Sequence, residues 1–123
     1  MSKGRVLAVD DEPEFAKMVS YRLKSAGYSV DIAFNGKQCI EQAKVSLPDI
    51  IVLDIKMPEL DGIATAFKLK ASPATSKIPI IMCTGIEDDD AQVLTRNLNV
   101  VDYFKKSSDM KELVTKVDGA LNK

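Results

Sequence analysis

The sequence predicts an α/β protein, a single domain built on a doubly wound, five-stranded parallel sheet with helices on both faces. Five short apolar runs alternate with five longer segments in which apolar residues recur at helical spacing. Strict alternation of strands and helices is typical of a parallel sheet covered on both sides. The chain has 123 residues, a length that suits one domain, so we expect that domain to occupy residues 1–123.

The apolar pattern of the five expected strands predicts their order in the sheet. The first, third and fourth runs are continuously apolar, as strands buried on both faces are. The second alternates apolar and polar residues and the fifth carries polar side chains, so we expect both at the edges. This favours the order 2-1-3-4-5, with a switch point between the first and third strands. The runs are Val6–Val9, Tyr28–Phe34, Ile50–Leu53, Ile78–Cys83 and Val100–Phe104.

Apolar stripes predict the five helices between and after these strands. The first and last stripes are the strongest, and the other three are weaker. In chain order they contain Phe15, Val19, Leu23 and Ala26; Ile40 and Ala43; Ile63, Ala66 and Phe67; Ala91, Leu94 and Leu98; and Met110, Leu113, Val114, Val117 and Leu121.

Residues with special backbone preferences agree with this division. Pro13 suits a first helical turn, and Gly27 suits the position that follows a helix end. The pair Asn35-Gly36 predicts a turn, and Asn99 predicts a left-handed residue after the fourth helix.

Composition excludes several classes of function. The chain has no histidine, so it has no Ser-His or Cys-His nucleophile pair and no His-ligated zinc. Cys39 and Cys83 are far apart and lack metal-binding spacing, which predicts reduced structural thiols. The net charge of −1 argues against direct nucleic-acid binding. No apolar run reaches the roughly 20 residues of a membrane helix and no signal peptide is present, so we expect a cytoplasmic protein without membrane contact.

Polar residues stand at the carboxyl ends of four expected strands, where such folds bind ligands. Asp10 and Asp11 follow the first strand, Asp54 follows the third, and Thr84 follows the fourth. A lysine pair, Lys105 and Lys106, ends the fifth. Capping of the first helix is an alternative role for Asp10 and Asp11.

Three carboxylates that meet without histidine or cysteine suit Mg²⁺. A carboxylate can also attack a phosphoryl group and form an aspartyl phosphate. Phosphoryl transfer requires positive charge and hydrogen-bond donors near the phosphoryl oxygens, and a metal, a lysine and a threonine would supply them.

These residues lie in motifs that resemble the receiver domain of two-component response regulators over essentially the whole chain. The matching stretches are VLAVDDEP (6–13), IIVLDIKMPELDG (50–62), IPIIMCTG (78–85) and VDYFKK (101–106). The resemblance implies a flavodoxin-like (βα)5 fold and a signalling switch in a phosphorelay. It implies a cytoplasmic phosphoprotein that is regulatory and not an enzyme beyond self-catalysed phosphoryl transfer and slow autodephosphorylation.

The resemblance also assigns roles residue by residue. Asp54 would be the phospho-acceptor. Asp11 would bind Mg²⁺ directly and Asp10 mainly through water, and Asp54 and the main-chain carbonyl of Lys56 would complete the protein ligands.

The remaining roles fall on the fourth and fifth strands. Thr84 would hydrogen-bond the phosphoryl group, and Lys106, rather than Lys105, would be the family's lysine. Alternation supports this choice, because Phe104 and Lys106 share one face of the strand. Tyr103 would be the aromatic residue that packs inward when the Thr84 hydroxyl moves. A sensor histidine kinase or histidine phosphotransfer protein would donate the phosphoryl group, and a downstream effector would read the surface of the fourth helix, fifth strand and fifth helix.

Two features depart from the family pattern. Ser107 and Ser108 stand where the family usually has proline in a cis peptide and an aromatic residue. Because a non-proline cis bond costs about 3–4 kcal/mol, we expect a trans Lys106–Ser107 bond and an altered loop. Lys56, two residues after Asp54, lies near the expected site entrance, where its side chain could influence water attack.

Other functions are alternatives to the switch. The two serines motivate a receiver-like scaffold that binds partners without phosphorylation. A flavodoxin-type cofactor binder would need a Ser/Thr/Gly-rich loop where this chain has DDEPE, and a haloacid-dehalogenase-type hydrolase would need DxDxT where it has DIKMP. The acidic run at residues 87–90 predicts a solvated first helical turn rather than a second metal site. The sequence leaves open a single-domain regulator and a receiver from a longer chain.

Overall fold

The computed structural model describes residues 2–85 and 90–122. Its five strands form one parallel sheet in the order β2-β1-β3-β4-β5, which confirms the predicted class and strand order. The strands are β1 (Arg5–Val9), β2 (Ser29–Ala33), β3 (Ile50–Asp54), β4 (Ile80–Thr84) and β5 (Val100–Lys105). The helices are α1 (Pro13–Ser25), α2 (Gly36–Ser46), α3 (Gly62–Ala71), α4 (Ala91–Leu94) and α5 (Met110–Leu121).

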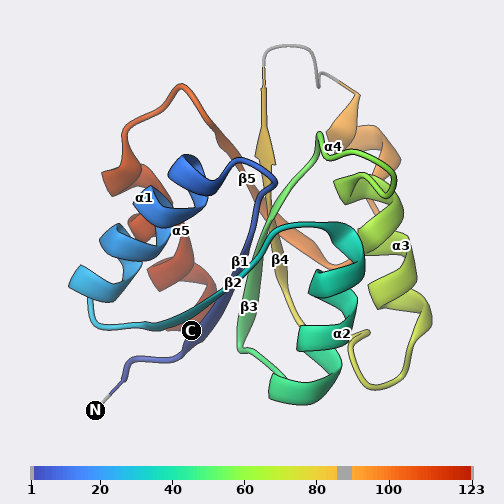
Figure 1. Ribbon diagram of the computed structural model, residues 1–123, viewed down its shortest axis with the longest axis horizontal. Helices are drawn as coiled ribbons and strands as arrows, with labels where there is room; N and C mark the ends of the chain where they lie inside the picture. The colour runs from blue at the N-terminus through green and yellow to red at the C-terminus, as the bar shows by residue number, and fades with distance from the viewer. Residues whose placement is uncertain (1, 86–89, 123) are drawn as a thin grey trace.

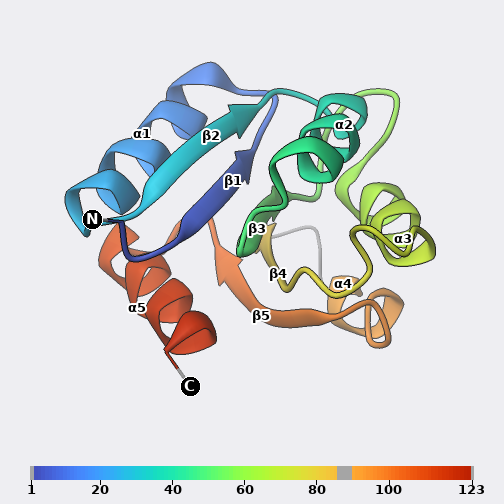
Figure 2. The ribbon, with the colours of Figure 1, turned by 90° about the horizontal axis from the view of Figure 1, so that it is seen from below.

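Helices cover both faces of the sheet. Helices α1 and α5 lie on one face and α2, α3 and α4 on the other, as both ribbon views show (Figures 1 and 2). The central strands β3 and β4 are buried along their whole length, whereas the edge strands β2 and β5 are only partly buried. The sheet therefore separates two apolar cores, as a doubly wound fold requires.

The edge strand β5 contributes to both cores because its side chains alternate. Phe104 is fully buried in the core under α1 and α5, and Tyr103 packs against the core under α2, α3 and α4. The strand thus sends one aromatic ring to each layer of helices.

The fourth helix is shorter than its apolar stripe predicts. Ala91 and Leu98 are buried, but Leu94 is half exposed and the helix ends there after one turn. The hydroxyl of Thr95, the first residue after α4, donates to the carbonyl oxygen of Ala91 at 2.6 Å, and the Thr95 amide donates to the same oxygen at 3.0 Å. Turns then lead to Asn99, whose φ of 61° confirms the predicted left-handed residue before β5.

Other local predictions have mixed outcomes. Pro13 begins α1, and Gly27 follows that helix with a φ of 106°, as expected. Phe67 is more than half exposed, so its place in the core stripe is wrong. Asn35 does not form a separate turn with Gly36; it caps α2 by accepting a hydrogen bond from the Gln38 amide at 2.8 Å.

The β3–α3 loop folds back tightly on the end of β3. The amide of Gly62 donates to the carbonyl oxygen of Ile55 at 2.7 Å, and the side chain of Asp61 caps α3. A Cβ atom on Gly62 would lie 2.1 Å from the carbonyl oxygen of Asp54. Only glycine fits this position, and its small size brings the start of α3 against the main chain of Asp54.

At the opposite edge of the sheet, the first residues of the chain contact α5. The ammonium of Lys3 lies 3.1 Å from Asp118 and 4.8 Å from the ring centroid of Tyr28. The buried Tyr28 donates its hydroxyl proton to Asp118, a bond that lowers the pKa of that carboxyl group. Within the described residues, no helix is long and apolar enough to span a lipid bilayer.

Candidate functional site

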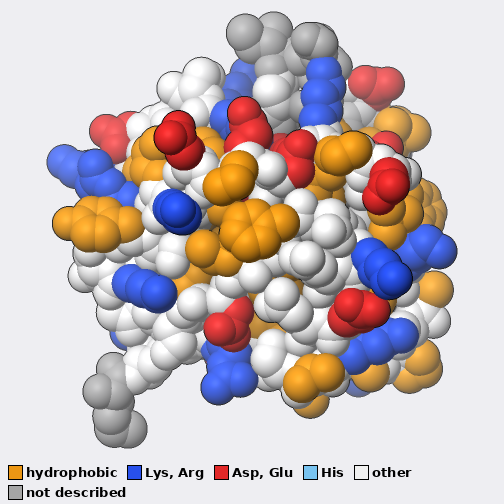
Figure 3. All heavy atoms as spheres, viewed as in Figure 1, with side chains coloured by type: hydrophobic (Ala, Val, Ile, Leu, Met, Phe, Trp, Pro, Cys, Tyr) orange, Lys and Arg blue, Asp and Glu red, His pale blue; other side chains and the backbone are white. Residues whose placement is uncertain are grey.

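The predicted site residues come together at the carboxyl ends of the strands. Asp10 directly follows β1, Asp54 ends β3, Thr84 ends β4 and Lys106 directly follows β5. Acidic side chains gather on the upper part of the molecule in the view of Figure 3, where these strand ends lie. Parallel strands explain the convergence, because they bring all their carboxyl ends to one edge of the sheet.

Three carboxylates form the centre of the site. Asp10, Asp11 and Asp54 each offer an oxygen, and these oxygens lie within 4.8 Å of one another. Asp10 and Asp54 are only 3% and 4% exposed, whereas Asp11 is partly exposed. Buried carboxylates this close repel each other, so the cluster favours a cation.

Lys106 supplies part of that positive charge. Its ammonium lies 2.9 Å from Oδ2 of Asp10 and 3.1 Å from Oδ1 of Asp54. It also lies 3.4 Å from Oε1 of Glu12 and 4.6 Å from the ring centroid of Phe15. The neighbouring Lys105 is exposed. The alternation of β5 therefore brings the second lysine of the pair, and not the first, to the carboxylates.

Burial dominates the protonation of the site. It raises the pKa of Asp54 to about 6; the negative charge of Asp10 also raises it, and the hydrogen bond and charge of Lys106 lower it. Burial also raises the pKa of Asp10. For Lys106, burial alone would lower the pKa, but hydrogen bonds and charges from the two carboxylates raise it above the ordinary lysine value. Lys106 is thus a permanent cation, and Asp54 is mostly ionised at neutral pH.

The alternative role of Asp10 and Asp11 as caps of α1 has no support in the hydrogen bonds. Glu12 occupies the N-cap position and makes no side-chain capping bond. Oδ1 of Asp10 accepts a hydrogen bond from the amide of Glu12 at 2.9 Å, outside the first helical turn. This bond holds the Asp10 carboxylate over the end of β1.

Thr84 lies beside the Asp54 position on the neighbouring strand. Asp54 is in register with Cys83, so Thr84 is one residue further towards the carboxyl edge. The carbonyl oxygen of Thr84 accepts a hydrogen bond from the amide of Lys106 at 2.9 Å, which joins the two strand ends. The described residues contain no cis peptide bond, so Lys106–Ser107 is trans, as expected.

Tyr103 faces the other layer of helices and is bonded there. Its hydroxyl lies 2.6 Å from Oγ1 of Thr95, in the turn that follows α4. The sequence does not predict this bond, because Thr95 lies in a segment whose apolar spacing predicts a helix.

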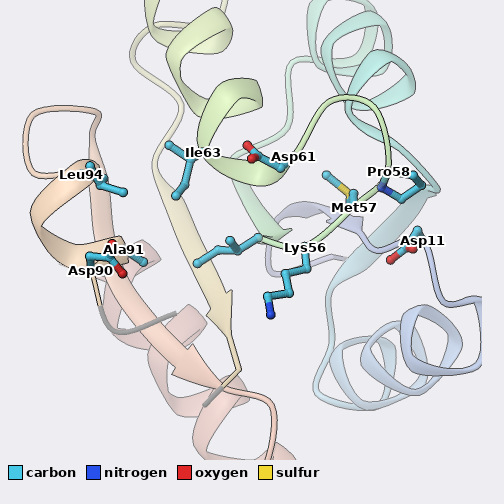
Figure 4. A pocket seen from close by; sticks show the side chains of 10 residues that line it. Asp11, Lys56, Met57, Pro58, Asp61, Ile63, Asp90, Ala91 and Leu94 are labelled. Carbon is cyan, nitrogen blue, oxygen red and sulfur yellow. The ribbon is translucent and has the colours of Figure 1, made fainter. Parts of the chain in front are cut away.

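A cavity of about 550 Å³ opens beside the carboxylates. Figure 4 shows its lining, with Lys56 between the β1–α1 loop, which carries Asp11, and α4, which carries Ala91 and Leu94. Its volume lies within the range of small-ligand sites, which is about 300–1,000 Å³. Coordination through the main-chain carbonyl of Lys56 stays a prediction. The Asp90 side chain also lines this cavity, while residues 87–89 of the predicted acidic turn lie outside the described residues.

The donor set fits Mg²⁺. All three carboxylates offer hard oxygen ligands, the kind that Mg²⁺ prefers. Oδ2 of Asp10 is buried, and the Lys106 ammonium lies 2.9 Å from it. The carboxylates outnumber the nearby cations, which is the condition under which a divalent ion binds favourably.

Sequence reasoning missed two neighbours of Lys106. Glu12 extends the acidic pair by one residue, and Phe15 places its ring against the lysine ammonium. Glu12 directly follows Asp10 and Asp11, and this run of three acidic residues could have indicated its place beside the site. Phe15 was assigned to the core stripe of α1, and its half-buried ring serves both purposes.

Comparison with known proteins gives the same family over most of the chain. The model of the response regulator receiver domain matches residues 6–118. The alkaline phosphatase synthesis transcriptional regulatory protein PhoP of Bacillus subtilis is 32% identical over 119 residues, which are 97% of this chain and 49% of that protein. The DNA-binding response regulator MtrA of Mycolicibacterium smegmatis is 32% identical over 121 residues, which are 98% of this chain and 52% of that protein. The chain thus spans about half the length of these curated relatives.

Solved structures agree. The signal receiver domain of a signal transduction histidine kinase from Syntrophus aciditrophicus has a TM-score of 0.87 at 29% identity, with 97% of this chain and 90% of that one covered. The Vibrio cholerae chemotaxis protein CheY4 has a TM-score of 0.89 at 26% identity, with 98% and 99% covered. The chain therefore belongs to the response regulator receiver domain family, the regulatory module of two-component systems.

Proposed function

We propose that this chain is a phosphoryl-accepting switch that takes a phosphoryl group onto Asp54 from a phosphohistidine of a partner protein. The observation that carries the proposal is the contact of Lys106 with both Asp54 and Asp10 within a cluster of three carboxylates. The donor would be a sensor histidine kinase or a histidine phosphotransfer protein, and the reaction would take place in the cytoplasm. The missing histidine of this chain is then the partner's contribution.

The chemical step follows from the ionisation of Asp54. A carboxylate with a pKa of about 6 is mostly deprotonated at pH 7 and can act as the nucleophile. Its oxygen attacks the phosphorus atom, the new P–O bond forms, and the P–N bond to the partner's imidazole breaks. The bonding electrons stay on the imidazole nitrogen, which takes up a proton. This chain promotes only its own modification and its slow reversal, so we do not propose it as an enzyme of wider turnover.

The residues around Asp54 would neutralise the incoming charge. Lys106 already lies 3.1 Å from Asp54 and would bind a phosphoryl oxygen from there. The Thr84 hydroxyl, at the end of the adjacent strand, would donate a hydrogen bond to another. Mg²⁺ held by Asp10, Asp11, Asp54 and the Lys56 carbonyl would supply further positive charge to the phosphoryl oxygens when bound.

The output would be a shift between two conformations. Contacts made only to the phosphoryl group would favour one arrangement of Thr84 and Tyr103, and so of the surface formed by α4, β5 and α5. A downstream effector protein would read that surface. Several relatives are named DNA-binding regulators, but the chain matches about half of their length, and we propose no direct nucleic-acid contact for this domain.

The test is phosphorylation by a small-molecule donor. The chain is incubated with acetyl phosphate and Mg²⁺, and its intact mass is measured. We expect a gain of one phosphoryl group in the wild type and none in Asp54→Asn or when Mg²⁺ is removed by a chelator. An equal gain in Asp54→Asn would contradict the assignment of Asp54, and no gain in the wild type would contradict the switch.

The scaffold alternative was motivated by Ser107 and Ser108. In the structure, Lys106 contacts both carboxylates although these serines follow it, which supports the switch. Amide spectra that do not change on addition of beryllofluoride and Mg²⁺ would favour the scaffold instead.

A further inference from the structure

The hydroxyl groups of Tyr103 and Thr95 form two consecutive hydrogen bonds that end on a main-chain carbonyl of α4. Oγ1 of Thr95 lies 2.6 Å from the carbonyl oxygen of Ala91 and 2.6 Å from the hydroxyl oxygen of Tyr103. A hydroxyl has one proton, and the proton of Thr95 is used on the Ala91 carbonyl. Tyr103 must therefore donate its own proton to Thr95.

The Thr95 and Ala91 end of these hydrogen bonds is shielded from water. Thr95 is 0% exposed and Ala91 is 2% exposed, while the ring of Tyr103 packs against the core under α2, α3 and α4. A buried hydroxyl oxygen that loses its donor cannot turn to water instead. The Thr95 side chain therefore favours the inward position of Tyr103 over any position in which its ring points to solvent.

The main chain of Tyr103 is tied to the other neighbouring helix. Its amide donates to Oδ1 of Asp102 at 2.8 Å, and the same oxygen lies 3.1 Å from the ammonium of Lys116 on α5. One residue of β5 thus connects to α4 through its hydroxyl and to α5 through its amide. The α4 end of this connection reaches the site, because Ala91 lines the cavity that Asp11 and Lys56 also line.

We propose that Thr95 is the positioning residue of the switch and holds Tyr103 inward before any phosphoryl group is bound. The inward ring is then the resting position of this chain. The inference rests on the proposed function for its consequence: by linkage, a contact that favours the inward ring also favours phosphorylation of Asp54 if phosphorylation selects that ring position.

The experiment first measures the position of Tyr103 without Mg²⁺ or phosphoryl donor. The chain is labelled with 3-fluorotyrosine, and the solvent isotope shift of each fluorine is measured by NMR in H₂O and D₂O. The three tyrosines provide their own scale, since Tyr21 is 70% exposed and Tyr28 is 4% exposed. Single Tyr→Phe variants assign the three signals.

Two variants separate the hydroxyl of Thr95 from the size of its side chain. Thr95→Val removes the hydroxyl, and Thr95→Ser keeps it. We expect the outward population of Tyr103 to rise about 3- to 10-fold in Thr95→Val, the range set by one net hydrogen bond, and to stay near wild type in Thr95→Ser.

A matched control excludes general loosening of the core. Thr75 is also buried, at 1% exposed, and its hydroxyl donates to the carbonyl oxygen of Leu69 at 2.7 Å, but it does not bond a tyrosine. Thr75→Val should leave the Tyr103 signal unchanged. An equal change in Thr75→Val and Thr95→Val, or no change in Thr95→Val, would overturn the proposal. If Thr95→Val does not fold, the same bond is removed from its other end: Tyr103→Phe should lower the urea midpoint more than Tyr21→Phe, at an exposed tyrosine, and an equal shift in the two variants would overturn the proposal.

A second measurement tests the link to the site. Beryllofluoride is titrated at fixed Mg²⁺, and its midpoint is read from the amide spectrum. We expect the midpoint to rise about 3- to 10-fold in Thr95→Val and to stay at the wild-type value in Thr95→Ser and Thr75→Val. A Tyr103 signal that shifts without a change in midpoint would overturn the coupling. A wild type that does not respond to beryllofluoride would contradict the proposed function, while the fluorine measurement would still decide the role of Thr95.

Discussion

The two helices that flank β5 are built very differently. Helix α5 has 12 residues and buries Met110, Leu113 and Val117; the side chain of Asp109, which precedes it, caps it by accepting a hydrogen bond from the Lys111 amide. Helix α4 has four residues, no side-chain capping bond at Asp90, and one buried residue, Ala91. Packing of an apolar face and a capped end stabilise α5, whereas α4 lacks a side-chain cap and is followed by a turn in which Thr95 bonds Tyr103.

The two helices therefore differ in the free energy that a change of conformation would cost. A short helix with little buried apolar surface opens with a small free energy, and a long packed helix opens only when the domain unfolds. Within the surface proposed for output, α5 is therefore the fixed reference and α4 the adjustable part.

The largest effect should come from deleting a buried side chain of α5. Leu113 is 0% exposed, and Leu113→Ala should lower the free energy of unfolding by about 2–5 kcal/mol. The equivalent deletion on α4, Leu94→Ala, removes a side chain that is 50% exposed and should change it by less than about 0.5 kcal/mol. Urea unfolding measures both. Similar losses in the free energy of unfolding for the two variants would contradict the inference that α5 is packed firmly and α4 is not.

The next effect concerns the buried charge of Asp54 and depends on pH. The pKa of Asp54 is raised from 3.8 to about 6, so its ionised form destabilises the fold fully above pH 6 and not at all below about pH 4. Asp54→Asn should therefore raise the free energy of unfolding at pH 8 by about 1–3 kcal/mol, and the gain should shrink as the pH falls towards 4.

Amide hydrogen exchange of the Asp54→Asn variant at pH 8 compares α4 with α5. The amides of α5 exchange only when the domain unfolds, so their protection from exchange should rise by the same free energy. The amides of α4 exchange through local opening, so their protection should change little. A gain that grows on acidification would contradict the assignment.

Removing the side chain at the N-cap position before each helix compares the two helix starts. Asp109→Ala should cost about 1 kcal/mol, because the amide of Lys111 loses its acceptor. Asp90→Ala should change the free energy of unfolding by less than about 0.5 kcal/mol, because Asp90 makes no side-chain capping bond. Thermal unfolding of the two variants under one condition measures both losses of stability. A larger loss in Asp90→Ala than in Asp109→Ala would show that the Asp90 side chain stabilises α4.

The smallest effect is expected for the ion pair that joins β5 to α5. Lys116 and Asp102 are partly exposed, and their charged atoms are 3.1 Å apart. Lys116→Gln should lower the free energy of unfolding by at most about 1 kcal/mol, and the loss should shrink in 1 M salt. Lys111→Gln, at an exposed position of the same helix, is the control. A loss that salt does not reduce would point to packing of the Lys116 stem instead of its charge.

The fold was predictable where apolar pattern and burial agree. Continuous apolar runs identified the central strands, and the alternating second run identified an edge. The fourth helix was not predictable from its stripe, because Ala91 and Leu98 are buried while Leu94, between them, is not. Apolar spacing shows which residues are buried, but it does not show whether the backbone between them stays helical.

The candidate site was predictable for a topological reason. Asp10, Asp54 and Thr84 lie at strand ends, and a parallel sheet brings such ends together whatever the loops do. The contact between Glu12 and Lys106 depends on a side chain in a loop, and the bond between Thr95 and Tyr103 depends on where a turn replaces a helix. The apolar pattern of the strands contains no information on either contact, so neither was predictable from the sequence.

The contact of Lys3 with Asp118 has a practical consequence for protein engineering. These residues are 115 positions apart in the chain, yet their charged atoms are 3.1 Å apart, at the edge of the sheet remote from the carboxylates. A short peptide could join the two ends of the fold, so a circular permutant, or insertion of the domain into a surface loop of a reporter protein, is geometrically simple. In such a fusion both connections would lie at one place, and the acidic site would keep its access to solvent and to a donor protein.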